Sequence, residues 1–139
     1  MVLRRVVVTG LGALTPIGNN IEEYWNGLMN GVSGAAPITY FDASKFRTHF
    51  ACELKNFNAE NFLDRKEARK MDRYAQYAMV ASDEAVVDAG FNLEKLDKDR
   101  IGVIWGSGIG GLETFQIEML NFAAGDGTPK FNPFFIPKM

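Results

Sequence analysis

The chain has 139 residues, of which 47% are hydrophobic and 23% charged, and its formal net charge is -2. These values are typical of one globular domain and give no general attraction to nucleic acid or to an anionic membrane surface. The single cysteine, Cys52, excludes an internal disulfide, and no apolar run reaches the roughly 18 residues of a membrane span. Thr9 and Gly10 interrupt the first apolar run, so we expect a cytoplasmic protein without a signal peptide.

The first third of the chain predicts a strand, a helix and a loop. Residues 3–9 are apolar on both faces, as in a central strand of a covered parallel sheet. Asn20 is a suitable cap for a helix that ends near Gly31 and carries its apolar residues on one face. Residues 31–48 are rich in turn formers and predict a long loop, and residues 49–54 predict a short strand.

His49 and Cys52 are the only residues of their types, which raises the question of a nucleophilic pair or half of a metal site. Positions three apart on a strand point to opposite faces, and the sequence offers no further His or Cys to complete a zinc shell. We therefore predict a packed cysteine, a histidine at the edge of a loop, and no metal site.

Two helices are predicted in the middle of the chain. Asp64, followed by Glu67, has the form of a capping box that opens a short helix. Asp72 can cap a longer helix that runs to Gly90. Alanine covers most of the circumference of the longer helix, so neighbouring backbones can approach it closely. This pattern predicts a buried central helix.

The last third predicts a second two-sided apolar strand over residues 101–105, a glycine loop, and a helix over about residues 112–123. Residues 123–139 are rich in turns and end in an apolar FFIP stretch that has no predicted element to pack against. Because these apolar segments require partners, we expect residues 1–139 to be a piece of a longer polypeptide.

The glycine loop matches G-x-G-x-x-G through Gly106, Gly108 and Gly111, between a predicted strand and a predicted helix. A dinucleotide site would also need an acidic residue at the end of a following strand, about 20 residues on. Asp126 has about that spacing but lies in a turn sequence, GDGTPK. Three interpretations stay open: a nucleotide site, a plain tight turn, and a wall of a pocket for an uncharged ligand.

Residues 65–73 carry five basic residues against two acidic ones, a local charge of +3 in a chain of -2. The basic residues are Arg65, Lys66, Arg69, Lys70 and Arg73. Helical spacing brings like charges four apart onto one face, where they repel slightly, so the segment is a candidate docking surface for an acidic partner. A merely solvated face is the alternative, and no further basic or aromatic residues extend the cluster toward a nucleic-acid site.

Four stretches in chain order carry a family resemblance: VVVTGLGALTPIGNN, RKEARKMD, RIGVIWGSGIGGLE and NPFFIP. Together they resemble the N-terminal part of a β-ketoacyl-acyl-carrier-protein synthase, most closely the type II elongating synthases of bacterial fatty-acid synthesis. The resemblance implies an α/β chain that forms part of the first half of a thiolase-like α-β-α-β-α sandwich, usually in a homodimer. It implies no cofactor.

In this family a cysteine at a helix N-terminus takes the acyl chain from acyl carrier protein as a thioester, and two histidines assist decarboxylation of the malonyl carrier. The resemblance places all three residues after Met139, and Cys52 does not match the family's cysteine motif. Residues 1–139 alone are therefore expected to be inactive. A carrier-protein-binding module without catalysis and a nucleotide-binding domain remain as alternatives.

Residue by residue, Lys66, Arg69 and Lys70 match basic positions that contact acidic carrier-protein helices in the family. The partners implied are therefore acyl- and malonyl-loaded carrier protein, with no nucleic acid and no membrane.

Three apolar positions match the acyl pocket of the family. Ile109 in the glycine loop matches an apolar gate, and Phe134 with Phe135 matches an aromatic wall near the dimer interface. On this basis the glycines serve close backbone approach and not phosphate binding.

Overall fold

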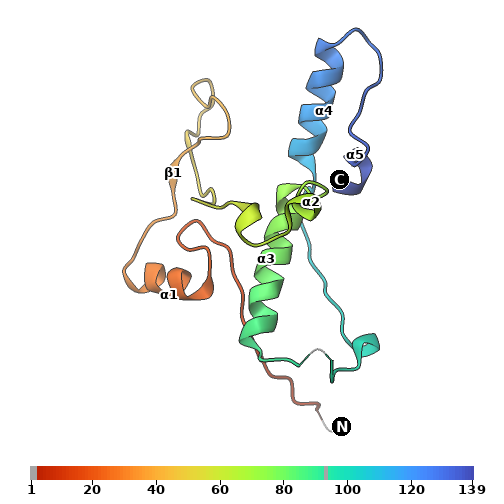
Figure 1. The fold of residues 1–139 in the computed structure, drawn as a ribbon. Coiled ribbons are helices and arrows are strands. Elements are labelled where there is room, and N and C mark those ends of the chain that lie inside the picture. The colour runs from red at the N-terminus through yellow and green to blue at the C-terminus, as the bar shows by residue number, and fades with distance from the viewer. Residues whose placement is uncertain (1–2, 93) are drawn as a thin grey trace. The chain divides into compact units, whose positions relative to one another are not determined.

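The computed structural model describes residues 3–92 and 94–139, which form helices, short 3-10 turns and one small sheet (Figure 1). The helices are α1 (Ile21–Met29), α2 (Arg65–Ala68), α3 (Arg73–Asp88), α4 (Leu112–Ala124) and α5 (Phe135–Lys138). The strands are β1 (Ala36–Pro37) and β2 (Phe50–Ala51), and the 3-10 turns are η1 (Ala59–Asn61) and η2 (Lys98–Arg100). Within these residues, no helix combines the length and the apolar character needed to cross a bilayer.

The backbone divides into two compact units. The first unit comprises Met1–Phe57 and Ala81–Leu96, and the second comprises Asn58–Val80 and Asp97–Met139. The long helix α3 therefore contributes one half to each unit.

Helix α1 of the first unit confirms its predicted start and end. The Asn20 side chain accepts a hydrogen bond from the backbone N–H of Glu23 at 2.8 Å and so satisfies a donor that the first turn cannot pair internally. Glu22 and Glu23 place negative charge at the positive end of the helix dipole. Gly31 follows with a φ of +62°, a left-handed conformation that favours glycine.

The strand predicted over residues 49–54 is shorter than expected. Only Phe50 and Ala51 pair, antiparallel, with Pro37 and Ala36 of β1. Cys52 lies just beyond this two-residue ladder and is exposed. The prediction of a packed cysteine is therefore wrong, because so short a strand brings no second layer over this position.

The first unit confirms the close approach predicted from the alanines of α3. A Cβ added to Gly12 would lie 2.0 Å from the carbonyl oxygen of Ala81, and one added to Gly10 would lie 2.2 Å from that of Ala85. Real Cβ atoms do not approach other atoms so closely. The glycines of the N-terminal segment, Gly10 and Gly12, and the alanines of α3 therefore allow the two backbones to approach closely.

Carboxylates of α3 also bind the backbone of the N-terminal segment, between Leu11 and Ile21. Glu84 accepts hydrogen bonds from the backbone N–H groups of Ala13 and Ile21, and Asp88 accepts one from Leu11, each at 2.8 Å. These three donors would otherwise lack an intramolecular partner or depend on water. Two acidic residues of α3 thus fix the start of α1 and the loop before it.

The strands predicted over residues 3–9 and 101–105 do not form in the described structure. Neither run belongs to a β ladder, and their apolar side chains face solvent: Val6 is 90% exposed and Ile104 is 98% exposed. A strand requires a neighbour to accept and donate its backbone hydrogen bonds, and residues 3–92 and 94–139 offer neither run one. Both runs are apolar, but the prediction that they form strands is wrong, because neither run pairs with another strand among the described residues.

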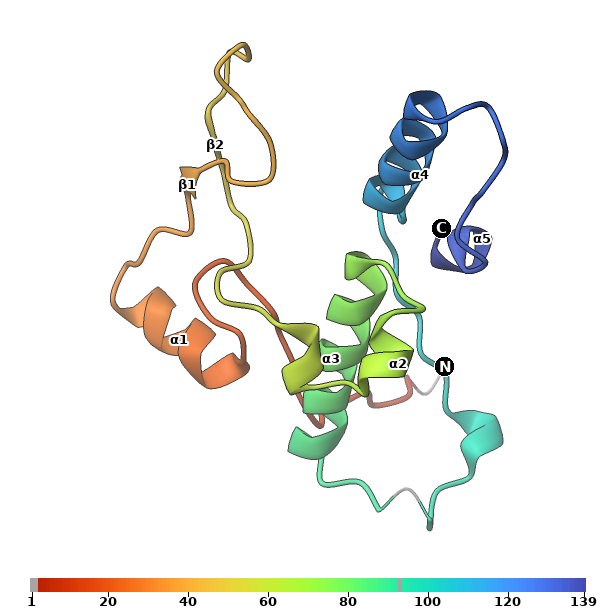
Figure 2. The same ribbon diagram turned by 45° about the horizontal axis from the view of Figure 1, so that its top comes forward.

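The end of the chain is more ordered than predicted. The FFIP stretch forms the short helix α5, which packs beside α4 in the second unit (Figures 1 and 2). The Phe135 ring lies 6.2 Å from that of Phe115 on α4 and 5.6 Å from that of Phe131, measured between centroids. The expectation that this stretch has nothing to pack against is wrong, because the Phe131 ring lies against both Phe122 of α4 and Phe135 of α5.

Asp72 precedes α3 as predicted, and its backbone carbonyl accepts the first hydrogen bonds of the helix. Its carboxylate, however, accepts hydrogen bonds from the backbone N–H and the hydroxyl of Thr114 in the first turn of α4. Asp72 is only 8% exposed. This buried acid therefore joins the starts of two helices of the second unit, a role that its helix-capping position alone did not predict.

Candidate functional site

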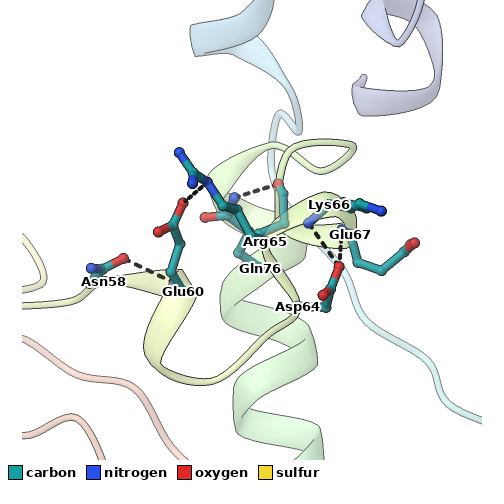
Figure 3. A network of polar contacts seen from close by, with 8 residues as sticks. Asn58, Glu60, Asp64, Arg65, Lys66, Glu67 and Gln76 are labelled. Carbon is teal, nitrogen blue, oxygen red and sulfur yellow. Dashed lines mark hydrogen bonds and ion pairs between the residues drawn. The ribbon is translucent and has the colours of Figure 1, made fainter.

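The basic segment predicted as a docking surface begins with two side-chain caps. The Asn58 side chain accepts a hydrogen bond from the N–H of Glu60 at 3.0 Å and starts η1. Asp64 accepts from the N–H groups of Lys66 and Glu67 at 2.8 and 3.2 Å and starts α2, as predicted (Figure 3). The Asp64 cap stabilises a helix, α2, that is too short to persist by its own propensity.

Helix α2 is attached to α3 within the second unit. Ala68, only 5% exposed, is the buried residue of α2, and the side chain of Gln76 on α3 donates to the Ala68 carbonyl at 2.9 Å. The same amide reaches the Met71 carbonyl at 3.4 Å. These bonds satisfy carbonyls at the end of α2 and fix which face of the helix is turned outward.

Helix α2 is short, as predicted, but it does not extend over all the basic residues that were expected to share its spacing. It ends at Ala68, so Arg69 is its C-cap residue and Lys70 lies in the following turn, where its N–H donates to the Glu67 carbonyl. The even helical spacing expected for the basic side chains therefore holds only in part. Lys66, Arg69 and Lys70 are nevertheless all exposed on this one segment.

We call the five cations Arg65, Lys66, Arg69, Lys70 and Arg73 the basic patch. Three of them form ion pairs: Arg65 with Glu60 at 3.2 Å, Lys70 with Glu67 at 2.6 Å, and Arg73 with Glu113 at 3.0 Å. Across the described ranges, Lys66 and Arg69 have no ion-pair partner. Two of the three predicted docking residues thus present unpaired charge to solvent.

The glycine loop contains two kinds of glycine. A Cβ at Gly106 or Gly108 would meet nothing within 4 Å, whereas one at Gly110 would lie 2.8 Å from the Tyr74 ring. Gly111 has a φ of +62° and lies against Met139. The second half of the loop is therefore glycine because of local packing and backbone conformation, without reference to phosphate.

Asp126, the acidic residue considered for a nucleotide ribose, occupies a turn. Its carboxylate accepts a hydrogen bond from the backbone N–H of Thr128 at 2.9 Å. Hydrogen bonds from Thr128, the backbone one foremost, hold the pKa of Asp126 below its ordinary value of 3.8. The turn engages this carboxylate locally, which disfavours the nucleotide interpretation.

The predicted acyl-pocket residues lie in the same unit in different surroundings. Ile109 is 72% exposed at the tip of the glycine loop, and Phe134 is exposed. Phe135 is half-buried against Phe115 and Phe131. The chain therefore provides an exposed branched side chain on a glycine-flanked loop and an aromatic cluster on α4 and α5.

Sequence reasoning did not find a hollow of about 270 Å³ in the first unit, between the Thr15–Asn19 loop and Lys55. The Asn19 side-chain amide donates to the Lys55 carbonyl at 2.9 Å, and the Glu23 carboxylate accepts from the Asn19 N–H. This contact joins residues 36 apart in the chain, which no local pattern signals. In the part of the chain that the structure describes, no three metal-ligating side chains gather as a site.

Comparison with known proteins identifies the family. The model of the β-ketoacyl synthase N-terminal domain matches residues 3–139. The chain belongs to the β-ketoacyl synthase family. It is 48% identical over 136 residues to 3-oxoacyl-[acyl-carrier-protein] synthase 2 of Synechocystis and, equally, to that of Staphylococcus aureus. Each alignment covers 98% of this chain, which spans about a third (32% and 33%) of the relatives' length.

Solved structures agree with the family. The ishigamide ketosynthase/chain length factor is 34% identical, with a TM-score of 0.77 over 97% of this chain and 34% of its own. A β-ketoacyl synthase from Burkholderia phymatum is 29% identical, with a TM-score of 0.74 over 99% of this chain and 34% of its own. The chain therefore has the mixed α/β, thiolase-like fold of ketosynthases, as the sequence predicted.

Proposed function

We propose that this chain is part of a condensing enzyme that elongates acyl chains on acyl carrier protein by decarboxylative condensation with malonyl-loaded carrier protein. The observation that carries the proposal is the family match over residues 3–139, together with relatives that are 3-oxoacyl-[acyl-carrier-protein] synthases. In this reaction the malonyl thioester loses CO2, its α-carbon bonds to the acyl carbonyl carbon, and the C–S bond of the acyl thioester breaks and releases the thiol. The reaction requires no redox cofactor, because no electrons are transferred to or from an external acceptor.

The basic patch is the proposed docking surface for the carrier protein. Lys66 and Arg69 offer unpaired charge, and Lys70 lies next to them, on a chain whose net charge is otherwise negative. A local positive field of this kind accelerates encounter with an acidic protein and orients it. The buried attachment of α2 through Ala68 and Gln76 supports the patch because it holds the cations on a fixed backbone.

Ile109 is the proposed apolar gate beside the acyl chain, and Phe134 with Phe135 forms the proposed aromatic wall. The exposure of Ile109 between Gly108 and Gly110 supports this role, because the loop presents an apolar side chain where solvent alone would favour a polar one. In the full-length enzyme, Ile109→Ala is expected to change the KM for acyl-carrier substrates in a chain-length-dependent manner. Met29→Ala, also at an exposed apolar residue, should leave the dependence on chain length unchanged.

The nucleophilic cysteine and the two histidines are proposed to lie outside residues 1–139. Cys52 supports this assignment, since it is an exposed residue at the end of a two-residue strand rather than at a helix N-terminus. We further propose that the whole protein is a cytoplasmic homodimer, in keeping with the family that it resembles. A carrier-binding module without catalysis is the second candidate, favoured only by the basic patch.

The docking proposal is tested by titrating the full-length protein with holo acyl carrier protein at two or more salt concentrations. Lys66→Glu combined with Arg69→Glu is expected to weaken binding at least about tenfold and to reduce its salt dependence. Lys95→Glu combined with Lys98→Glu changes the net charge equally at exposed lysines outside the patch and serves as the control. Equal binding by the two double variants would show that the basic patch is not the docking surface.

A further inference from the structure

The basic patch is partly neutralised by carboxylates of its own segment. Glu60, in η1, pairs with Arg65, and Glu67, in α2, pairs with Lys70 (Figure 3 shows Glu60 and Glu67 on either side of α2). Both pairs are exposed, with 43–65% of each side chain accessible, so neither is locked in place by burial. A partner with acidic side chains would therefore meet Arg65 and Lys70 already engaged by carboxylates of the same segment, and Arg73 engaged by Glu113.

The pair formed by Glu67 is the tighter of the two. Its carboxylate lies 2.6 Å from the Lys70 ammonium, in a geometry that is also a hydrogen bond. Lys70 is three residues after Glu67, and the turn between them is closed by the Lys70 N–H donating to the Glu67 carbonyl. Backbone and side chain thus both hold Lys70 against Glu67.

We propose that Glu67 is an internal competitor of the acidic partner: it holds Lys70 in the free protein and must release it before Lys70 can bind a partner carboxylate. This inference rests on the proposed docking function of the patch. Lys66 and Arg69, which have no such competitor among the residues described, make the first contact. Lys70 joins the interface only after exchanging one carboxylate for another.

The exchange is energetically accessible because an exposed ion pair contributes little to stability. For the same reason its effect on binding is modest, and it limits how tightly the partner is held. Removing the competitor should therefore strengthen docking by a small factor. That factor should depend on Lys70, because Lys70 is the group that Glu67 occupies.

The test is a double-variant cycle in the full-length protein, with holo acyl carrier protein as the probe. Glu67→Gln removes the charge and keeps a side chain suited to the third position of a capped helix. We expect Glu67→Gln to tighten binding about two- to fivefold, and we expect no gain when the same change is made in a Lys70→Gln background. Asp99→Asn, which changes the charge equally at an exposed residue outside the patch, controls for net charge.

Two results would overturn the inference while leaving the docking surface intact. One is unchanged affinity of Glu67→Gln. The other is an equal gain in the Lys70→Gln background or in Asp99→Asn, which would mean that Glu67 acts only through general repulsion. If the unaltered protein fails to bind the carrier protein, or if the Lys66→Glu and Arg69→Glu variant binds normally, the proposed docking function of the patch fails and the inference fails with it.

Discussion

Gly12→Ala tests the backbone contact between the N-terminal segment and α3. The added Cβ would lie 2.0 Å from the Ala81 carbonyl oxygen and 2.7 Å from the Ala85 nitrogen, both backbone atoms that no rotamer change can move. To reach even 3.0 Å from the nearer atom, the segment must move by roughly 1 Å, and overpacking of this kind costs about 1–3 kcal/mol. The same movement strains the nearby hydrogen bond from Ala13 to Glu84.

The measurement is thermal unfolding of the full-length protein followed by circular dichroism at one scan rate. The cost corresponds to a fall in Tm of at most roughly 2–12 °C, the range for a domain of 150–250 residues, because the shift per kcal/mol becomes smaller in a larger cooperative unit. Gly125→Ala is the control, because its Cβ would meet only ordinary contacts at 3.4 Å or more and its φ of -86° suits alanine. If Gly12→Ala has the same Tm as Gly125→Ala, the close contact between the N-terminal segment and α3 does not exist.

Three further predictions concern the second unit. Asp72→Asn should lower the free energy of unfolding by about 1–3 kcal/mol in urea titrations, because an amide cannot replace all of the hydrogen bonding of the carboxylate to Thr114. An unchanged urea midpoint would show that this link does not stabilise the protein. NMR titration should give Asp126 a pKa below 3.8. Because its pKa is lowered in the folded state, the ionised carboxylate stabilises the protein above pH 3.8, and this contribution is lost as the pH falls through the lowered pKa. A titration midpoint at or above 3.8 would contradict the hydrogen bonds from Thr128. Phe135→Ala should destabilise the protein by about 1–2 kcal/mol in the same urea titrations, since a half-buried ring and its aromatic contacts are lost, and no change would mean that α5 does not pack on α4.

Local signals in the sequence predicted the elements whose stability is local. Asn20 and Asp64 cap α1 and α2 as their residue types predict, and the alanines of α3 permit the close approach of Gly12. The runs 3–9 and 101–105 were predicted as strands from their two-sided apolar pattern. That pattern shows which side chains must be buried but does not say which strand lies beside them. The strand prediction was wrong because the described residues provide no neighbouring strand for either run.

Long-range contacts account for most of what the sequence could not predict. Nothing around Asp72 indicates that its carboxylate binds Thr114, 42 residues away, and nothing in FFIP indicates that Phe135 packs against Phe115 of α4. At the candidate site, composition predicted the basic patch. Only the folded structure distinguishes Lys66 and Arg69, which have no ion-pair partner among the described residues, from Lys70, because pairing depends on which carboxylate the fold brings within reach.

We propose above that this chain belongs to an enzyme that condenses acyl and malonyl units on carrier protein. The most direct test is to incubate the full-length protein with acyl-loaded and malonyl-loaded carrier protein and to analyse the carrier by intact-protein mass spectrometry. We expect a 3-oxoacyl carrier two carbons longer than the acyl substrate, with one CO2 released for each product formed. Carrier binding without any such product would contradict this proposal and would favour a binding module without catalysis.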